Sequence, residues 1–146
     1  MAKSHGRLLY FAVTPPGGGL TDLSSQTEEV SGLPGDIDLG DITTAGSVGH
    51  ISYPGLQKVK VTSKHVYDDT AVTGCFTVLG GFQATQQSTP TTYWLLTYGP
   101  RGSTAGYPKI TVSALVSSLT LDSKVTDPLK FSVSWEGCSG VTIGTF

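Results

Sequence analysis

The sequence predicts a mainly β domain, a β-sandwich or small barrel with one short flanking helix and a long extended loop. Its polarity comes mostly from hydroxyl groups, since the 146 residues include 20 Thr and 16 Ser but only 14% charged side chains. Thr favours strands, and the good helix formers Glu, Lys and Arg are scarce. Short alternating segments separated by Gly and Pro also indicate a sandwich or barrel. A chain of this length supports one core, so residues 1–146 are predicted to form a single domain.

The first part of the chain contains two predicted strands and one weak helical turn. Residues 8–13 are a continuous apolar run that stops at a Pro-Pro-Gly sequence, as a buried strand does. A short helical turn is expected over residues 22–29, where an Asp and two Ser residues can cap it. Residues 56–62 alternate strictly, with Val59 and Val61 on one face, which predicts a half-exposed strand.

The rest of the chain is predicted to hold one helix followed by strands. Residues 68–81 begin with two acids, end with two glycines and carry apolar side chains at helical spacing, although a strand over residues 75–79 is the alternative. Four later segments have the apolar or alternating pattern of strands, so six or seven strands are expected in total. They span residues 93–98, 110–121, 129–135 and 141–143.

Residues 30–53 form the longest stretch without a strand or helix pattern. The stretch is rich in Gly and Asp, and its apolar residues are isolated from one another. A loop of this length is either disordered or buries its apolar residues on another molecule. We favour an arm that lies on a neighbouring subunit, with its acids facing a basic patch that includes Lys58 and Lys60. The predicted interface residues are Leu33, Pro34, Ile37, Asp38, Leu39, Asp41, Ile42, Thr43, Thr44, Pro54, Gly55 and Leu56.

The sequence contains no complete catalytic motif, and an enzyme is not expected. Residues 137–140, Gly-Cys-Ser-Gly, resemble the nucleophile elbow of hydrolases, but Val141 replaces its last Gly and too little chain follows for the required helix. A hydrolase that uses Ser139 or Cys138 is therefore a minor alternative. Neither a phosphate-binding loop nor a dinucleotide-binding Gly-rich motif is present.

Metal, cofactor and sugar sites are not expected either. The three histidines, His5, His50 and His65, are far apart in the sequence and are predicted to lie on the surface. The aspartates of the predicted arm have neither the spacing of an EF-hand loop nor its closing Glu, so a solvated loop is favoured over a calcium site. Trp94 and Trp135 lie in apolar strand patterns, which favours core packing over a sugar platform.

Charge and cysteine content favour a soluble, cytosolic product over a membrane or secreted protein. The net charge is −2 and the isoelectric point is about 5.8, so the basic surface of a tight nucleic-acid binder is not expected. The apolar run over residues 8–13 is too short for a membrane span or a signal sequence. Cys75 and Cys138 are predicted to be reduced thiols.

Several short motifs resemble those of the major tail (tail tube) proteins of long-tailed bacteriophages. They fall in the order and approximate spacing of that family, over about residues 22–62 and the C-terminal part of the chain. The chain departs from the family at Ala45, where an aromatic residue or Met is usual, and over residues 83–107. The motifs are Asp22-Leu23-Ser24, Gly32-Leu33-Pro34-Gly35, Asp41-Ile42-Thr43-Thr44-Ala45-Gly46, Pro54-Gly55-Leu56, Trp135-Glu136-Gly137 and Gly144-Thr145-Phe146.

The resemblance implies a structural virion protein without a cofactor. Such a protein assembles with itself into hexameric rings, which stack into the tail tube, and genome DNA passes through without sequence-specific binding. The resemblance also implies tape measure and tube terminator proteins as partners, synthesis in the bacterial host cytoplasm and a final place in the virion tail. Two other functions stay open: a head-tail connector or tail completion ring protein, and a monomeric β-sandwich that binds a glycan or a receptor.

Overall fold

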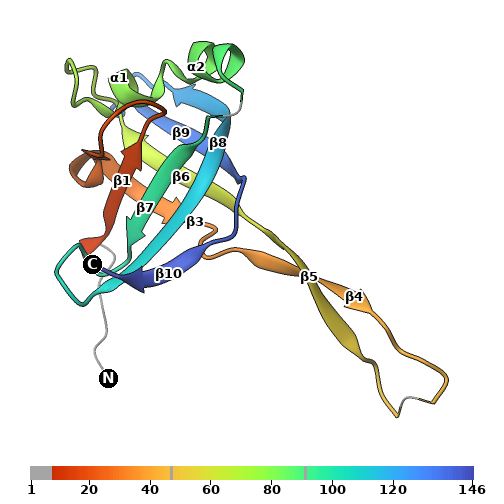
Figure 1. The fold of residues 1–146 in the computed structure, drawn as a ribbon. Helices are drawn as coiled ribbons and strands as arrows, with labels where there is room; N and C mark the ends of the chain where they lie inside the picture. Colours follow the sequence, from red (N-terminus) through yellow and green to blue (C-terminus); the bar gives the residue numbers. More distant parts are fainter. Residues whose placement is uncertain (1–7, 47, 91) are drawn as a thin grey trace.

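The computed structural model describes residues 8–46, 48–90 and 92–146. Most of them form one bent antiparallel sheet, from which a two-stranded hairpin projects (Figure 1). The sheet has the order β2-β1-β7-β8-β9-β6-β3, and β10 pairs with the first part of β8. Because the end strands β2 and β3 do not pair with each other, the mainly β fold is an open sheet and not a closed barrel. The elements are β1 (Tyr10–Thr14), β2 (Thr21–Asp22), the 3-10 helix η2 (Ser24–Gln26), β3 (Thr27–Ser31), β4 (Asp36–Asp41), β5 (Ser52–Lys58), β6 (Lys60–Val66), α1 (Cys75–Leu79), α2 (Phe82–Ser88), β7 (Trp94–Gly99), β8 (Pro108–Asp122), β9 (Lys130–Gly137) and β10 (Thr142–Thr145).

The predicted strands are present, and the described residues form more strands than expected. The helical turn predicted over residues 22–29 ends at Gln26, because the residues that follow pair with β6 as strand β3. The strand predicted over residues 56–62 is divided at Val59 into β5 and β6. Val59 and Val61 are both buried, so the predicted faces of this segment are confirmed.

One face of the sheet carries the hydrophobic core. Every second side chain of β6 and β9 is buried there, as the alternating sequence predicts. Trp94 and Trp135 are 2% and 1% exposed, and their rings pack edge to face with centroids 5.8 Å apart. Their predicted place in the core is confirmed, so neither ring is available to a sugar.

A chain of hydrogen bonds crosses the core beside Trp135. The Trp135 Nε1 donates to Ser63 Oγ (3.1 Å), and this oxygen lies 2.9 Å from His65 Nε2. On the other side of the ring, His65 Nδ1 lies 3.0 Å from Thr27 Oγ1, which itself donates to the Leu23 carbonyl oxygen (2.8 Å). Since the Thr27 hydroxyl has one proton, it must accept from Nδ1. Nδ1 therefore carries a proton. In the neutral imidazole Nε2 is then an acceptor, and Ser63 donates to it.

His65 corrects the prediction that all three histidines lie on the surface. Its side chain is fully buried, beside the rings of Phe11 and Phe131. Burial lowers the pKa of His65 from 6.5 to about 4, because a charged imidazolium would lose its hydration. The position is compatible with a polar ring because both nitrogens have hydrogen-bond partners. His50 is exposed, as predicted, and His5 lies outside the described residues.

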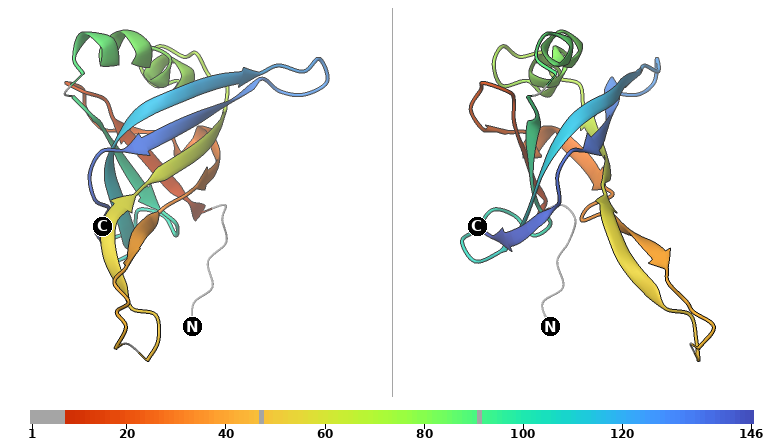
Figure 2. Two further views of the ribbon diagram at one scale, coloured as in Figure 1. Left: turned by 90° about the vertical axis from the view of Figure 1, so that its right-hand side faces the viewer. Right: turned by 45° about the vertical axis from the view of Figure 1, so that its right-hand side comes forward.

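Two short helices replace the single helix predicted over residues 68–81. The segment at α1 is a helix, not the alternative strand, but it begins only at Cys75. The Asp68 carboxylate accepts hydrogen bonds from the backbone and hydroxyl of Thr70, so the acidic start of the predicted helix forms a turn instead. α2 lies beyond the predicted end, where polar side chains showed no helical pattern. Both helices lie at one end of the bent sheet (Figures 1 and 2).

Helix α2 covers the part of the β8 edge that β7 does not reach. Because the strands are antiparallel, the first residue of β7, Trp94, lies opposite Ala114, and the residues of β8 after Ala114 have no partner in β7. Two residues further along β8, the Gln86 side chain bonds both backbone groups of Val116: Nε2 donates to the carbonyl oxygen (3.0 Å), and Oε1 accepts from the N–H (2.7 Å). The side-chain amide thus takes the place of the backbone amide of a neighbouring strand. Because open strand edges promote aggregation, this contact protects the sheet as well as stabilising it.

We expect Gln86→Ala to lower the free energy of unfolding by about 1–2 kcal/mol, because both backbone groups of Val116 lose their partner. Gln87→Ala is the matched control, since Gln87 lies on the same helix but is exposed. Urea unfolding followed by circular dichroism measures the difference. Equal stability of the two variants would show that the contact between Gln86 and Val116 contributes nothing to the folded state.

Candidate assembly surface

The segment predicted to be a loop is a β-hairpin that extends away from the sheet. β4 and β5 pair in antiparallel register, with Leu39 opposite Pro54 and Gly40 opposite Tyr53. We call residues 36–58 the hairpin arm. Figures 1 and 2 show that the arm adjoins the sheet only at its base. An isolated two-stranded hairpin is marginally stable in water, which favours a role in which the arm lies on another molecule.

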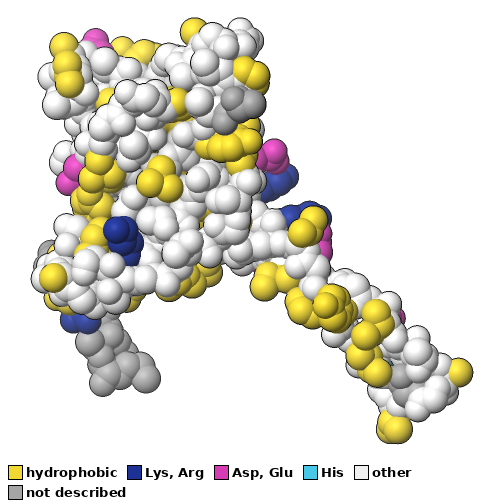
Figure 3. All heavy atoms as spheres, viewed as in Figure 1, with side chains coloured by type: hydrophobic (Ala, Val, Ile, Leu, Met, Phe, Trp, Pro, Cys, Tyr) yellow, Lys and Arg dark blue, Asp and Glu magenta, His cyan; other side chains and the backbone are white. Residues whose placement is uncertain are grey.

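Large apolar side chains are exposed along the whole hairpin arm (Figure 3). Leu39 is 69% exposed and Leu56 is 84% exposed. Neither belongs to the hydrophobic core or packs against it. Contiguous apolar surface of this kind marks an interaction site in a soluble protein. The other exposed apolar side chains of the arm are Ile37, Ile42, Val48, Ile51 and Tyr53.

Most of the predicted interface residues lie on the hairpin arm, and Leu33 is the clearest difference. Leu33 is half-buried and packs against the core of its own chain, because it precedes β4 where the chain still runs beside the sheet. Pro34 is exposed at the base of the arm. The others belong to β4, to β5 or to the turn between them: Ile37, Asp38, Leu39, Asp41, Ile42, Thr43, Thr44, Pro54, Gly55 and Leu56.

Lys58 and Lys60, the predicted charge partners of the arm, each have a partner in their own chain. Lys58 Nζ lies 3.1 Å from an Asp38 carboxylate oxygen on the facing strand of the hairpin. Lys60 Nζ lies 3.6 Å from a Glu136 carboxylate oxygen on β9. These side chains are exposed, so each pair adds little to stability. The arm acid Asp38 thus pairs with Lys58 inside one hairpin.

Hydrogen bonds join the two sides of the hairpin arm at the base of its turn. The Asp41 carboxylate accepts from the backbone N–H of Thr43 (2.8 Å), and Thr43 Oγ1 accepts from the backbone N–H of Ile51 (2.9 Å). The hydrogen bonds from Thr43 lower the pKa of Asp41 because they favour its charged form. His50 Nδ1 lies 3.8 Å from the same carboxylate. The two sides of the turn are therefore linked.

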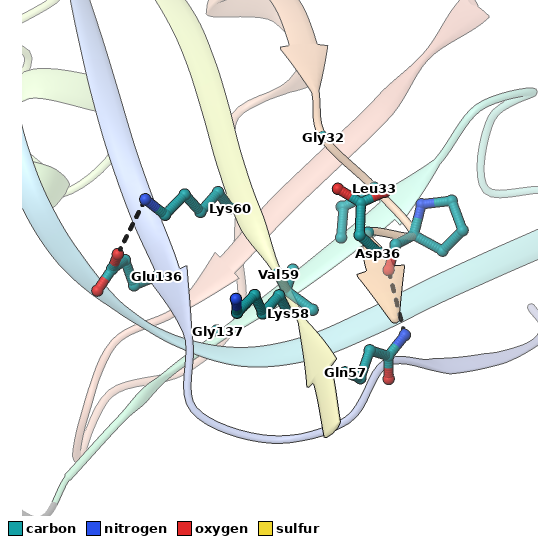
Figure 4. Close-up of a pocket in the computed structure, with 11 residues that line it drawn as sticks. Gly32, Leu33, Asp36, Gln57, Lys58, Val59, Lys60, Glu136 and Gly137 are labelled. Carbon is teal, nitrogen blue, oxygen red and sulfur yellow. Dashed lines mark hydrogen bonds and ion pairs between the residues drawn. The ribbon is translucent and has the colours of Figure 1, made fainter. Parts of the chain in front are cut away.

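A hollow of about 610 Å³ lies at the base of the hairpin arm, between the start of β4 and the junction of β5 with β6 (Figure 4). Leu33, Val59 and the backbone of Gly32 line part of it. The chain passes so close to β6 here that a Cβ on Gly32 would lie 1.9 Å from the Lys60 carbonyl oxygen, and the φ of Gly32 is +95°. Only glycine is compatible with this backbone conformation and this close approach to β6.

Gln57 and Glu136 are functional candidates that sequence reasoning missed. Gln57 Nε2 donates to the Pro34 carbonyl oxygen (3.4 Å), and its Oε1 accepts from the backbone N–H of Val141 (3.0 Å). Gln57 thereby joins both sides of the arm base to the segment that leads into β10. Glu136 neutralises Lys60 at the rim of the hollow (Figure 4). A single sequence carries no signal for either contact, because each depends on strands that are far apart in the chain.

The face of the sheet opposite the core is covered with hydroxyl groups and paired charges. The outward side chains of β6, β9 and the last part of β8 include Thr62, Ser118, Thr120, Ser132 and Ser134. Three lysines of this face each pair with an acid of another strand: Lys60 with Glu136, Lys64 with Glu29 (3.2 Å) and Lys130 with Glu28 (2.8 Å). With Asp122 opposite Lys130, three lysines and four acids give this face a net charge of −1. Such a surface attracts phosphate groups weakly.

The hydrolase-like motif does not form a catalytic arrangement. Ser139 Oγ accepts from the backbone N–H of Ser113 (3.3 Å) and donates to the Gly140 carbonyl oxygen (3.3 Å), and neither group is a base. Cys75 and Cys138 are free thiols, and desolvation raises the pKa of both, which disfavours the reactive thiolate. Within residues 8–46, 48–90 and 92–146, no cluster of acidic, His and Cys side chains could hold a metal ion. The described helices are too short to span a membrane.

The fold belongs to the class found in the tubes of phage-like tails and contractile injection systems. No family model and no curated protein matches the sequence. A chain of the tail of an empty GTA particle, determined with C6 symmetry, superposes with a TM-score of 0.68 at 10% identity, over 98% of this chain and 100% of that chain.

Two further solved structures give the same result. A chain of the PVC sheath-tube complex in the extended state, from an extracellular contractile injection system, has a TM-score of 0.64 at 18% identity, over 93% of this chain and 88% of that chain. The SPP1 tail tube protein has a TM-score of 0.63 at 11% identity, over 99% of this chain and 80% of that chain. The likeness establishes that this chain has a tail tube fold.

Proposed function

We propose that this protein is a structural subunit of a phage-type tail tube. The observation that carries the proposal is the exposed apolar hairpin arm on a fold shared, over nearly the whole chain, with tail tube proteins. The C6 symmetry of the GTA tail supports six subunits per ring for this chain as well. Rings of six that stack into a tube need binding surfaces and no catalytic group.

The hairpin arm suits an assembly of many identical subunits. The arm and the surface that receives it are different parts of the molecule, so their contact is heterologous and either closes into a ring or continues as a stack. A fully buried aliphatic side chain contributes about 2 kcal/mol. Burial of three such side chains, Ile37, Leu39 and Ile42, would contribute about 6 kcal/mol per contact, before the cost of ordering the interface is subtracted. The other exposed apolar side chains of the arm, Val48, Ile51, Tyr53 and Leu56, would add to this burial.

The hydroxyl-covered face suits the wall of a passage for DNA. Free lysines would hold the phosphates of a moving duplex through the release of counterions. On this face Lys60, Lys64 and Lys130 are neutralised by acids of the same chain, and the remaining side chains are mostly short and uncharged. We therefore place this face toward the lumen, where genome DNA would slide without sequence-specific contacts.

Replacing Glu28 and Glu29 by Gln is expected to make the assembled tube bind duplex DNA. The change removes the ion-pair partners of Lys130 and Lys64 on every subunit while preserving the shape of the side chains, although Asp122 stays opposite Lys130. We expect at least a tenfold rise in affinity at about 50 mM salt, with a steep loss as the salt concentration increases. Co-sedimentation of short labelled duplexes with assembled tubes measures this affinity.

Asp22→Asn with Asp69→Asn is the matched control for charge. It changes the net charge by the same amount but removes acids that have no ion-pair partner on the hydroxyl-covered face. Equal DNA binding by the control would show that net charge alone is responsible. That result would contradict the assignment of this face to the lumen.

Electron microscopy of the purified, concentrated protein tests the function itself. We expect rings or tubes on the order of 100 Å wide, because each wall needs packed sheets about 10 Å apart around a hole that admits a duplex. A protein that stays monomeric at millimolar concentration, alone and with tail partner proteins, would contradict the proposal.

The proposal includes a place and partners in the particle. We expect the protein to be made in the bacterial host cytoplasm and to end in the virion tail. Its partners would be copies of itself, the tube terminator and the tape measure protein, with genome DNA as a passing molecule.

A further inference from the structure

We propose that the turn of the hairpin arm inserts into the hollow at the arm base of another copy of this chain. This inference rests on the proposed tube function and deepens it, because it names the two surfaces that meet. The described residues of the turn are 42–46 and 48–51, and the hollow is the one bordered by Leu33, Pro34 and Val59.

The hollow is open, of suitable size and partly apolar. Leu33, Pro34 and Val59 contribute carbon atoms to its lining, and three glycines add no side chain. Charged and polar side chains form the rest of the lining: Asp36, Gln57, Lys58, Lys60 and Glu136 (Figure 4). An engineered cavity of roughly 150 Å³ accommodates benzene. A volume of about 610 Å³ therefore receives more than one aliphatic side chain.

The described part of the turn exposes aliphatic side chains, and hydrogen bonds join the two sides of its base. Val48 is fully exposed, and Ile42 and Ile51 are about half exposed beside it. The hydrogen bonds between Asp41, Thr43 and Ile51 link the two sides of the turn before any partner binds. Because these hydrogen bonds already restrain the base of the turn, the base loses little conformational freedom on insertion.

The turn and the hollow of one chain cannot meet. The hairpin arm is extended and carries its turn away from its own base in every view (Figures 1 and 2). The contact must therefore join two copies, and each copy supplies one turn to one neighbour and one hollow to another. About twelve extended residues separate Asp36 from Val48, so consecutive copies would be displaced by no more than about 40 Å.

Charged groups at both surfaces are compatible with this contact. Lys58 and Lys60 stand at the hollow with well-exposed ammonium groups, so each can face a second carboxylate besides its own partner. The turn carries the Asp41 carboxylate at its start, with His50 beside it. Insertion would place Asp41 of one copy near the lysines of the next. This arrangement would keep the predicted pairing of arm acids with Lys58 and Lys60 of a neighbouring copy.

Disulfide crosslinking tests the contact directly. In a Cys138→Ser background, Val48→Cys places a thiol on the turn and Asp36→Cys places one at the hollow, while the native Cys75 stays buried. The two single variants are mixed, assembled and oxidised. We expect crosslinked dimers of one variant with the other, and ladders of higher oligomers when one chain carries both changes.

Val125→Cys is the matched competitor, because Val125 is an equally exposed apolar residue at the turn between β8 and β9. Tubes in which Val125→Cys, but not Val48→Cys, crosslinks to Asp36→Cys would overturn the inference and assign the hollow to that turn. Tubes in which neither crosslinks would also overturn it, with the tube function intact. A failure to form rings or tubes at all would overturn the proposed function together with this contact.

Discussion

Replacing Leu39 and Ile42 together by Asp is expected to leave the monomer folded and to prevent its assembly. Both side chains are exposed on the hairpin arm and lie outside the core, so their loss costs the monomer little. In an assembled contact each would contribute about 2 kcal/mol, and a buried carboxylate adds a desolvation cost. A loss of about 4 kcal/mol weakens each contact roughly a thousandfold.

Light scattering against protein concentration measures this effect, and circular dichroism checks the fold. Leu20→Asp is the control, because Leu20 is comparably exposed but lies between β1 and β2, away from the arm. We expect this control to assemble normally. If the double variant instead loses secondary structure, the arm residues belong to the core of their own subunit. If it assembles normally, the hairpin arm is not the contact surface.

The second large effect is a loss of stability in mild acid, caused by His65. Its pKa is about 4 in the folded chain and 6.5 in the unfolded chain, so only the unfolded chain takes up a proton between these values. The contribution of His65 to the free energy of unfolding is therefore fully present above pH 6.5. It falls as the pH is lowered to about 4 and does not change further below that value. The full loss is about 3 kcal/mol, at about 1.4 kcal/mol per pKa unit.

The hydrogen-bond network explains why the folded chain resists this proton. Nε2 of His65 accepts from Ser63, whose oxygen already accepts from Trp135. A proton on Nε2 would turn this acceptor into a donor, and Ser63 would need a new acceptor inside the core. The charge would also lie between aromatic rings, without a described carboxylate in its network.

His65→Gln tests this prediction, because Gln accepts and donates hydrogen bonds but does not titrate near neutral pH. Urea unfolding at several values between pH 7 and pH 4.5 measures the slope of stability against pH. We expect a shallower slope for His65→Gln than for the wild type, whatever its absolute stability, and His50→Gln, at an exposed histidine, is the control variant. Parallel slopes for wild type and His65→Gln would assign the acid sensitivity to other groups.

Local patterns in the sequence determine the strands of the sheet and their buried faces. The alternation around Val59 and Val61, and again along β9 and the first part of β8, is strict, and the structure buries those faces. Trp94 and Trp135 lie in such patterns and both are core residues. Apolar and polar residues alternate in the sequence wherever one face of a strand is buried by its own chain.

Tertiary structure alone decides the form of the arm and the contacts of its charges. β4 and β5 leave Leu39 and Leu56 exposed, so burial in the monomer imposed no alternating pattern by which the hairpin could be recognised. The pairs of Lys58 with Asp38 and Lys60 with Glu136 depend on strand register.

His65 is the other position that only the tertiary structure decided. An isolated histidine in a sequence is most often exposed, and its burial here requires hydroxyl partners from other elements of the fold. The sequence alone was therefore sufficient for the central strands of the sheet and for the position of a projecting segment. The shape of that segment and the buried polar network needed the fold, because both depend on residues that meet across strands rather than along the chain.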